Sequence, residues 1–196
     1  MPGDPHDSLR ADRKLGPIVS RVGEVTVEPA EDFFARFVVS ILRQQISMES
    51  AAATRERLFD TVEVTPEGIL YADQETLQDV GLSRQKAQYV QNVARAFREE
   101  GYSRVYFEEM PDDEVRAELT TITGVGQWTA DMQLIFSLGR PDVFPVGDLG
   151  IRRGMVRLFD DLAVEDRTPM VDRAEQWAPY RSYASRYLWR AVEDVA

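Results

Sequence analysis

Apolar residues with the spacing of an α-helix recur through most of this chain, in short segments that capping residues and prolines separate. In one such segment Phe34, Phe37 and Ile41 follow helical spacing before the polar sequence RQQ begins. Ser47 and Ser83 are placed to cap the helices that follow them. Strand-like alternation is weak and is confined to the first 30 residues. The chain is therefore predicted to be all-α, with roughly nine or ten helices.

The length and the apolar content limit the number of folding units. With 196 residues, 43% of them hydrophobic, the chain can bury one sizeable core, or two small lobes around a cleft, without disulfides or metal ions. Residues 1–28 are expected to form an N-terminal tail with a short extended entry, because the region from Val19 to Val27 alternates weakly. Residues 29–196 are expected to form the core.

The lack of thiol side chains and the single imidazole remove whole classes of chemistry. No cysteine is present, which excludes disulfides, thiolate zinc sites, cysteine nucleophiles and cysteine-ligated iron–sulfur clusters. His6 lies in a polar N-terminal stretch, which argues against a Ser-His-Asp triad and against His-rich metal centres. The sequence has no signal-like apolar segment at its start and no run of about 18 apolar residues. We therefore expect a soluble, cytoplasmic chain with no membrane partner.

The formal net charge of −11 would ordinarily argue against a nucleic-acid partner. Among 23 basic residues only Lys14 and Lys86 are lysines, and 34 residues are acidic. Such a composition resembles that of proteins from salt-loving archaea, although an acidic protein from an organism with arginine-rich codon usage would look the same. Net charge leaves the sign of any one binding face open.

Two glycines with one residue between them separate two predicted helices in the segment LTTITGVGQWTAD. Gly124 and Gly126 allow a tight backbone turn, and the first N–H groups of the next helix have no acceptor within that helix. Such amides bind phosphate, because they donate hydrogen bonds at the positive end of the helix dipole. A tight turn between helices, with no ligand, is the alternative explanation of an isolated pair of this kind.

Five segments together resemble the helix-hairpin-helix (HhH-GPD) superfamily of base-excision DNA glycosylases. The hairpin segment matches that family at Leu119, Ile122, Gly124, Val125, Gly126, Thr129 and Ala130. About twenty residues further on, DVFPVGDLGIRRG carries Asp148 where the family has its catalytic Asp. The segments ILRQQIS and GLSRQKAQYVQNVARAF are similar to the family's minor-groove loop and its GxxxxKA segment. WAPYRSYASRYLW is similar to the closing helix of the 3-methyladenine DNA glycosylase II family. The resemblance covers roughly residues 30–192, and it implies two helical lobes with the active-site cleft between them.

The resemblance implies roles for one carboxylate and two glutamines. A glycosylase flips the damaged nucleotide out of the duplex and fills the gap with a wedge, for which Gln45 is the candidate, with Gln44 beside it. Positive charge develops on the sugar as the base leaves, so Asp148 would stabilise that charge and orient or deprotonate a water molecule. Helix capping by Asp148, and packing of the glutamines within a loop, are the alternatives. Other acids, Asp131 and Asp142 among them, are expected to be surface or capping groups.

The hairpin is the implied anchor for the DNA backbone. Gly124, Val125, Gly126 and Thr129 would contact a phosphate, and the backbone carbonyls of Ile122 and Val125 would hold one monovalent cation, K⁺ or Na⁺. No other cofactor is required by this chemistry, because an alkylated base is already an activated leaving group.

Aromatic side chains are the predicted walls of the base pocket. A purine alkylated on a ring nitrogen is cationic, and a cation binds favourably to an aromatic face. Trp128 and Trp189 are the first candidates for such faces, and Tyr183 is a third. Core packing is the usual role of a Trp at helical spacing and stays the alternative.

Two departures from the family narrow the expected activity. Trp128 stands where bifunctional relatives such as endonuclease III carry a Schiff-base lysine, and no four-cysteine cluster follows. Met132 and Leu149 replace pocket tyrosines of the family, which leaves the damaged base undetermined. We therefore expect a monomeric, monofunctional glycosylase that releases alkylated purines, such as 3-methyladenine and 7-methylguanine, from double-stranded DNA. A non-catalytic helix-hairpin-helix DNA-binding module is the alternative.

Overall fold

The computed structural model describes residues 3–193, and within that range the regular structure is entirely helical, as predicted. The helices are α1 (Pro5–Arg10), α2 (Gly16–Val22), α3 (Phe33–Leu42), α4 (Met48–Thr61), α5 (Pro66–Tyr71), α6 (Gln74–Asp79), α7 (Arg84–Glu100), α8 (Arg104–Phe107), α9 (Asp112–Thr120), α10 (Gln127–Phe136), α11 (Leu149–Leu158), α12 (Arg167–Ala174) and α13 (Arg181–Glu193), with a 3₁₀ turn at Glu175–Trp177. None of these helices is both long and apolar enough to cross a lipid bilayer.

The chain folds into two compact units. Residues 29–138 form one of them, here called the central unit. Residues 1–28 join those from 139 onward to form the other, here called the terminal unit. The expected boundary at residue 28, between a tail and a core over residues 29–196, is corrected accordingly, because the first 28 residues belong to the same unit as the C-terminal helices.

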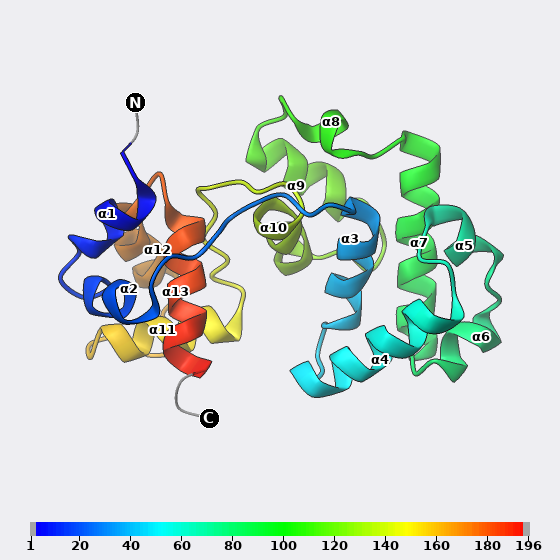
Figure 1. Ribbon diagram of the computed structural model, residues 1–196, viewed down its shortest axis with the longest axis horizontal. Coiled ribbons are helices and arrows are strands. Elements are labelled where there is room, and N and C mark those ends of the chain that lie inside the picture. Colours follow the sequence, from blue (N-terminus) through cyan, green and yellow to red (C-terminus); the bar gives the residue numbers. More distant parts are fainter. Residues whose placement is uncertain (1–2, 194–196) are drawn as a thin grey trace. The chain divides into compact units, whose positions relative to one another are not determined.

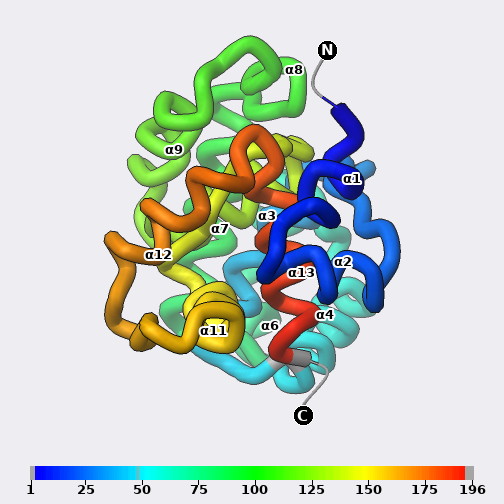
Figure 2. Tube along the Cα trace, turned by 90° about the vertical axis from the view of Figure 1, so that its left-hand side faces the viewer, coloured from blue at the N-terminus to red at the C-terminus, as the bar shows by residue number. Residues whose placement is uncertain are grey.

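In the terminal unit the core gathers around α13, which packs against α11, α2 and α1 (Figure 2). Trp177 and Tyr187 are among the largest fully buried side chains. The N-terminal segment is not a tail, since it contributes α1 and α2 and is tied down by long-range bonds. The hydroxyl of Tyr187 donates to the Gly23 carbonyl at 2.9 Å, and the indole nitrogen of Trp177 donates to Asp12 at 3.2 Å. Helices of six and seven residues offer too short an apolar pattern to be recognised in sequence.

In the central unit α3 lies between α7 and α10, and α4 also packs against it (Figure 1). The rings of Phe33, Phe34 and Phe37 on α3 meet Phe97 of α7, with centroids 5.1 Å apart in the two closest pairs. This confirms the helical spacing predicted for Phe34 and Phe37. The apolar pattern ends at Leu42, so the polar turn that follows α3 is held at the edge of this core.

Candidate functional site

The hairpin between α9 and α10 is present where the two glycines predict it. Gly124 has a φ of 104°, and a β-carbon there would lie 2.2 Å from Cγ of Tyr89, whose ring covers the turn. Only glycine fits that position. Gly126 is the N-cap of α10 and has open space where a side chain would project. A phosphate can therefore approach the backbone at Gly126, whereas Gly124 is required by packing.

Three hairpin carbonyls accept hydrogen bonds within the central unit. The side chain of Asn92 on α7 donates to the Thr123 carbonyl, and that of Gln44 donates to the Gly124 carbonyl, each at 3.0 Å. The Ile122 carbonyl accepts from the backbone N–H of Val125 at 2.9 Å. The two carbonyls engaged by side chains are thus different from those of Ile122 and Val125, the predicted cation ligands. No cluster of three or more His, Asp or Glu side chains within residues 3–193 could hold a metal ion.

The two adjacent glutamines occupy different environments. Gln44 is half-buried, and its Nε2 donates both to the Gly124 carbonyl and to Oγ1 of Thr129, the latter at 2.9 Å. Gln45 is exposed and has a φ of 58°, in the left-handed region that few side chains adopt. Gln45 therefore has the freedom that a wedge needs, while Gln44 is committed to the protein.

Thr129 and Val125 do not present their side chains to solvent. Thr129 is 1% exposed and accepts the bond from Gln44, and Val125 is 6% exposed. The phosphate contact predicted for this segment is made by backbone groups, so burial of the two side chains does not bear on it, and it stays a prediction. The helical phase of α10 turns the Thr129 side chain towards the core.

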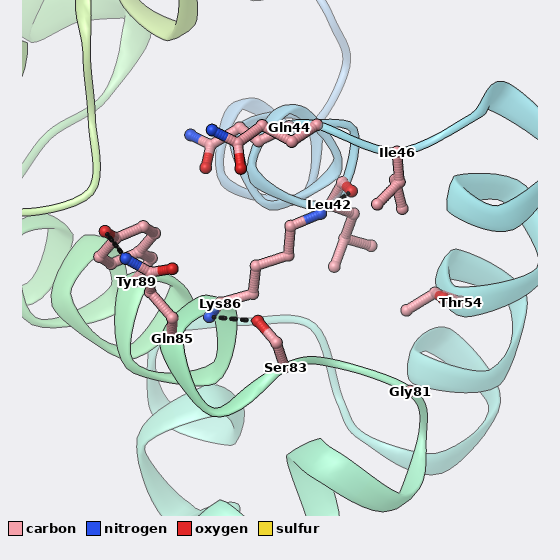
Figure 3. Close-up of a pocket in the computed structure, with 10 residues that line it drawn as sticks. Leu42, Gln44, Ile46, Thr54, Gly81, Ser83, Gln85, Lys86 and Tyr89 are labelled. Carbon is pink, nitrogen blue, oxygen red and sulfur yellow. Dashed lines mark hydrogen bonds between the residues drawn. The ribbon is translucent and has the colours of Figure 1, made fainter.

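A cavity of about 310 Å³ lies beside the turn that carries Gln44 and Gln45 (Figure 3). Lys86 crosses it and donates from Nζ to the Leu42 carbonyl at 2.6 Å, where α3 ends. Burial lowers the pKa of the Lys86 amine. The lysine of the GxxxxKA segment thus joins the start of α7 to the end of α3, a role that no local pattern could reveal.

Two further acids have structural partners. Asp131 on α10 is buried and pairs with Nε of Arg116 at 2.7 Å. Burial raises the pKa of its carboxyl, and Arg116 opposes that shift. Asp131 is therefore neither a surface nor a capping group, which corrects the prediction. Asp142 pairs with Arg181 at 2.8 Å and accepts the backbone N–H of the same residue, so its predicted capping role is confirmed.

In the terminal unit Asp148 is the N-cap of α11. Its Oδ1 accepts the backbone N–H of Ile151 at 3.0 Å and the indole N–H of Trp189 at 2.9 Å. Arg152 donates to the Val146 and Gly147 carbonyls, which holds the segment before the cap. Asp148 therefore does cap α11, which was the alternative role. The same carboxylate is held in place by two donors, so capping is compatible with the predicted catalytic role.

Gly150 makes the contact between Asp148 and Trp189 possible. A β-carbon at this position would lie 2.9 Å from Cδ1 of the Trp189 indole and 3.0 Å from Oδ1 of Asp148. Contacts that short essentially never occur, so any side chain here would displace the indole. Gly150 stands two residues after the predicted acid, but sequence alone does not show why glycine is needed there. The reason is the indole of Trp189, which comes from α13, about 40 residues later in the chain.

Two of the three aromatic candidates, Tyr183 and Trp189, lie on different faces of α13. Trp189 contacts Asp148, but Tyr183 lies on another face of α13, where its ring meets His6 and Tyr180 with centroids 5.7 and 6.2 Å apart. Tyr183 does not lie beside Asp148, because residues six positions apart on a helix point in different directions, and only Trp189 contacts Asp148. Trp128 belongs to the central unit, in the first turn of α10, and is partly exposed.

Comparison with known proteins matches the part of the chain that contains the residues described above. The model of the HhH-GPD superfamily of base excision DNA repair proteins matches residues 38–179, a range that holds the glutamines, the hairpin and Asp148. The chain belongs to this superfamily. The match covers residues 38–138 of the central unit and residues 139–179 of the terminal unit.

Individual HhH-GPD relatives agree with this. The alkylbase DNA glycosidase-like protein mag2 of Schizosaccharomyces pombe is 30% identical over 91% of this chain and 88% of its own length. YfjP of Bacillus subtilis, provisionally named a DNA-3-methyladenine glycosylase, is 38% identical over 65% of this chain, which spans 45% of that relative. The structure of S. pombe 3-methyladenine DNA glycosylase (Mag1) with abasic DNA has a TM-score of 0.85, 28% identity and 95% coverage of both chains.

Proposed function

We propose that this protein is a monofunctional DNA glycosylase of base excision repair that releases alkylated purines from double-stranded DNA. The observation that carries the proposal is the carboxylate of Asp148, held by a helix N-terminus and an indole N–H in a chain of the HhH-GPD superfamily. The names of the relatives, two of them 3-methyladenine glycosylases, support the substrate class.

The proposed reaction breaks the C1′–N bond of a flipped nucleotide. The electron pair of that bond leaves with the base and neutralises the positive charge on the alkylated ring. Positive charge develops on the sugar, and Asp148 stabilises it while a water molecule adds to C1′. The water gives its proton to the Asp148 carboxylate, which passes it to solvent. No general acid is required, since the base is activated by its own charge. The products are the free base and an abasic site.

The groups of the central unit are proposed to prepare the nucleotide for that step. Backbone amides at Gly126 and the start of α10 bind a phosphate, as open space at Gly126 permits. Gln45 fills the gap that the flipped nucleotide leaves. Trp128 supplies an aromatic face for the cationic base.

Release of free base from a methylated duplex tests the function directly. The purified protein should release 3-methyladenine or 7-methylguanine, and chromatographic separation of the free bases would also rank the two. Binding to the duplex without any release would favour the alternative, a non-catalytic DNA-binding module.

The proposal includes an intact DNA strand as product. Schiff-base chemistry needs an amine at the reacting sugar, and this chain has Trp128 where lyases carry that lysine. Borohydride should therefore trap no covalent protein–DNA adduct on a substrate duplex, with a bifunctional glycosylase as the positive control. A trapped adduct would contradict the proposal that the enzyme is monofunctional.

We further propose that the carbonyls of Ile122 and Val125 hold one K⁺ or Na⁺ that bridges to a DNA phosphate. Neither carbonyl is engaged by a side chain in the bonds described above, and the carbonyl of Ile122, which accepts the N–H of Val125, keeps a second lone pair for a cation. Affinity for an undamaged duplex should be higher in K⁺ than in a bulky organic cation at equal ionic strength. Equal affinities would remove the support for this site. We also propose that the protein is a monomer in the cytoplasm. Light scattering after gel filtration checks the monomeric state.

A further inference from the structure

The turn from Arg43 to Ser47, here called the wedge turn, carries the exposed Gln45 between α3 and α4. A wedge is pushed into stacked bases, so the turn that bears it must resist being pushed back. Gln45 itself adds strain, because a left-handed φ of 58° costs a non-glycine residue about 1 kcal/mol. Something outside the turn must therefore hold it in place.

Gln44 meets that requirement. Its carboxamide nitrogen has two hydrogens, and both are used: one donates to the Gly124 carbonyl and the other to Oγ1 of Thr129. These bonds cross 80 and 85 residues of sequence. They join the wedge turn to the hairpin and to the first turn of α10, which are the groups proposed to bind phosphate.

The hairpin is a firm support for this connection. On its other side Asn92 donates to the Thr123 carbonyl, and the ring of Tyr89 lies against Gly124. Lys86, from the same helix as these two residues, binds the Leu42 carbonyl at the start of the wedge turn (Figure 3). Helix α7 thus holds the hairpin and the end of α3, and Gln44 closes the remaining gap between them.

We propose that Gln44 is a positioning residue that fixes the distance between the wedge and the phosphate anchor, so that Gln45 enters the duplex at a set spacing from the bound phosphate. This rests on the proposed function, in which Gln45 acts as the wedge. Gln44 itself does not enter the DNA. Its carboxamide sets where Gln45 enters.

The test compares Gln44→Met with wild type. Met keeps the length of the side chain and removes its two donors. The probe is a duplex that carries an abasic-site analogue opposite 2-aminopurine, whose emission changes as the wedge fills the gap. The insertion rate should fall about tenfold, because two net hydrogen bonds are lost. Affinity for an undamaged duplex should stay within about twofold, since the phosphate anchor remains. Gln78→Met is the matched control, because Gln78 is exposed on α6 and its side chain donates to the Gln74 carbonyl of the same helix.

A second pair of variants changes Thr129, the acceptor of one of the two Gln44 bonds. Thr129→Val removes the acceptor hydroxyl and should slow insertion by a smaller factor, whereas Thr129→Ser should restore it. The double variant Gln44→Met/Thr129→Val should be no slower than Gln44→Met, because the shared bond is already gone. If Gln44→Met fails to fold, the Val and Ser variants at Thr129 still decide the question.

Hydrogen exchange gives a measure that needs neither DNA nor catalysis. Amides of the wedge turn should exchange about tenfold faster in Gln44→Met, while those of α10 should not change. Insertion rates within twofold of wild type, equal losses in Gln78→Met, or additive effects in the double variant would each overturn the proposal. Absence of base release by the wild type, with these results intact, would instead overturn the proposed function alone.

Discussion

The two units of the molecule differ in how they can meet a polyanion. The central unit has 19 acidic and 10 basic residues, whereas the terminal unit has 15 and 13. The more acidic unit carries the hairpin, whose proposed contacts with phosphate are backbone amides. The less acidic unit carries α11, which has three arginines and no acidic residue. A chain with a net charge of −11 can therefore offer a phosphate backbone N–H groups on one unit and local positive charge on the other.

The largest effect is expected at the carboxylate of the terminal unit. Asp148→Asn keeps the shape and much of the capping capacity but loses the charge, so single-turnover excision should fall about 10²- to 10³-fold. Damaged-DNA affinity and melting temperature should change little. Asp73→Asn is the control, since Asp73 caps α6 through the Thr76 amide in the same way. A rate for Asp148→Asn within about threefold of wild type would refute the catalytic assignment.

The next effect separates the two tryptophans. Trp189→Phe keeps a ring but removes the donor to Asp148, and a hydrogen bond to a charged group contributes about 1.5–3 kcal/mol. Excision should therefore fall about 10- to 100-fold with little change in affinity for damaged DNA. Gly150→Ala should act in the same direction, because it displaces the indole.

Trp128 should behave in the opposite manner. Trp128→Phe keeps an aromatic face and should retain most of the activity, whereas Trp128→Ala should weaken binding of damaged DNA together with the rate. Equal losses for Trp128→Phe and Trp189→Phe would remove the distinction drawn between the two units.

The hairpin glycines provide a third comparison, within the central unit. Gly124→Ala would force a β-carbon into Tyr89 at a positive φ, and should lower the free energy of unfolding by about 1–3 kcal/mol. Gly126→Ala meets open space, so its stability should stay within about 0.5 kcal/mol of wild type. Its affinity for an undamaged duplex should fall severalfold, because the methyl group hinders a phosphate. Thermal melting and titration with labelled DNA measure the two effects.

A smaller effect is expected from two arginines of the terminal unit, and it is measured as the salt dependence of DNA affinity. Arg153 and Arg157 are exposed on α11, one helical turn apart. If both contact phosphates, Arg153→Gln/Arg157→Gln should reduce the slope of log affinity against log salt by about 1.8. The control is Arg98→Gln/Arg104→Gln on the central unit, which should leave the slope unchanged. A loss of slope in the control alone would reverse the comparison.

The smallest effect concerns the acidic surface as a whole. Self-repulsion among 34 acidic residues is screened by salt, so the melting temperature should rise by a few degrees from low to molar KCl. A steady fall would contradict the interpretation that this is a salt-adapted protein.

Local patterns predicted the hairpin, the cap at Asp148 and most helices after residue 28, because each depends on residues a few positions apart, but they missed α1 and α2. They did not predict which partner a side chain finds across the fold. Gln44 and Gln45 are neighbours with the same side chain, and only the packing of α3 against α10 gives one of them a partner 80 residues away. Helical phase alone places Tyr183 and Trp189 on different faces of α13, whereas the contact of Tyr183 with His6 of α1 depends on tertiary packing.

The terminal unit is built from two stretches of chain, with the whole central unit between them. A ribosome therefore delivers α1 and α2 long before α11 and α13 exist, whereas residues 29–138 emerge as one continuous block that can fold on the way. The bond between Asp148 and Trp189 forms only when nearly all of residues 3–193 have been made. A nascent or prematurely ended chain would therefore hold a folded hairpin, the proposed phosphate anchor, without the Asp148–Trp189 pair that the proposed base release requires.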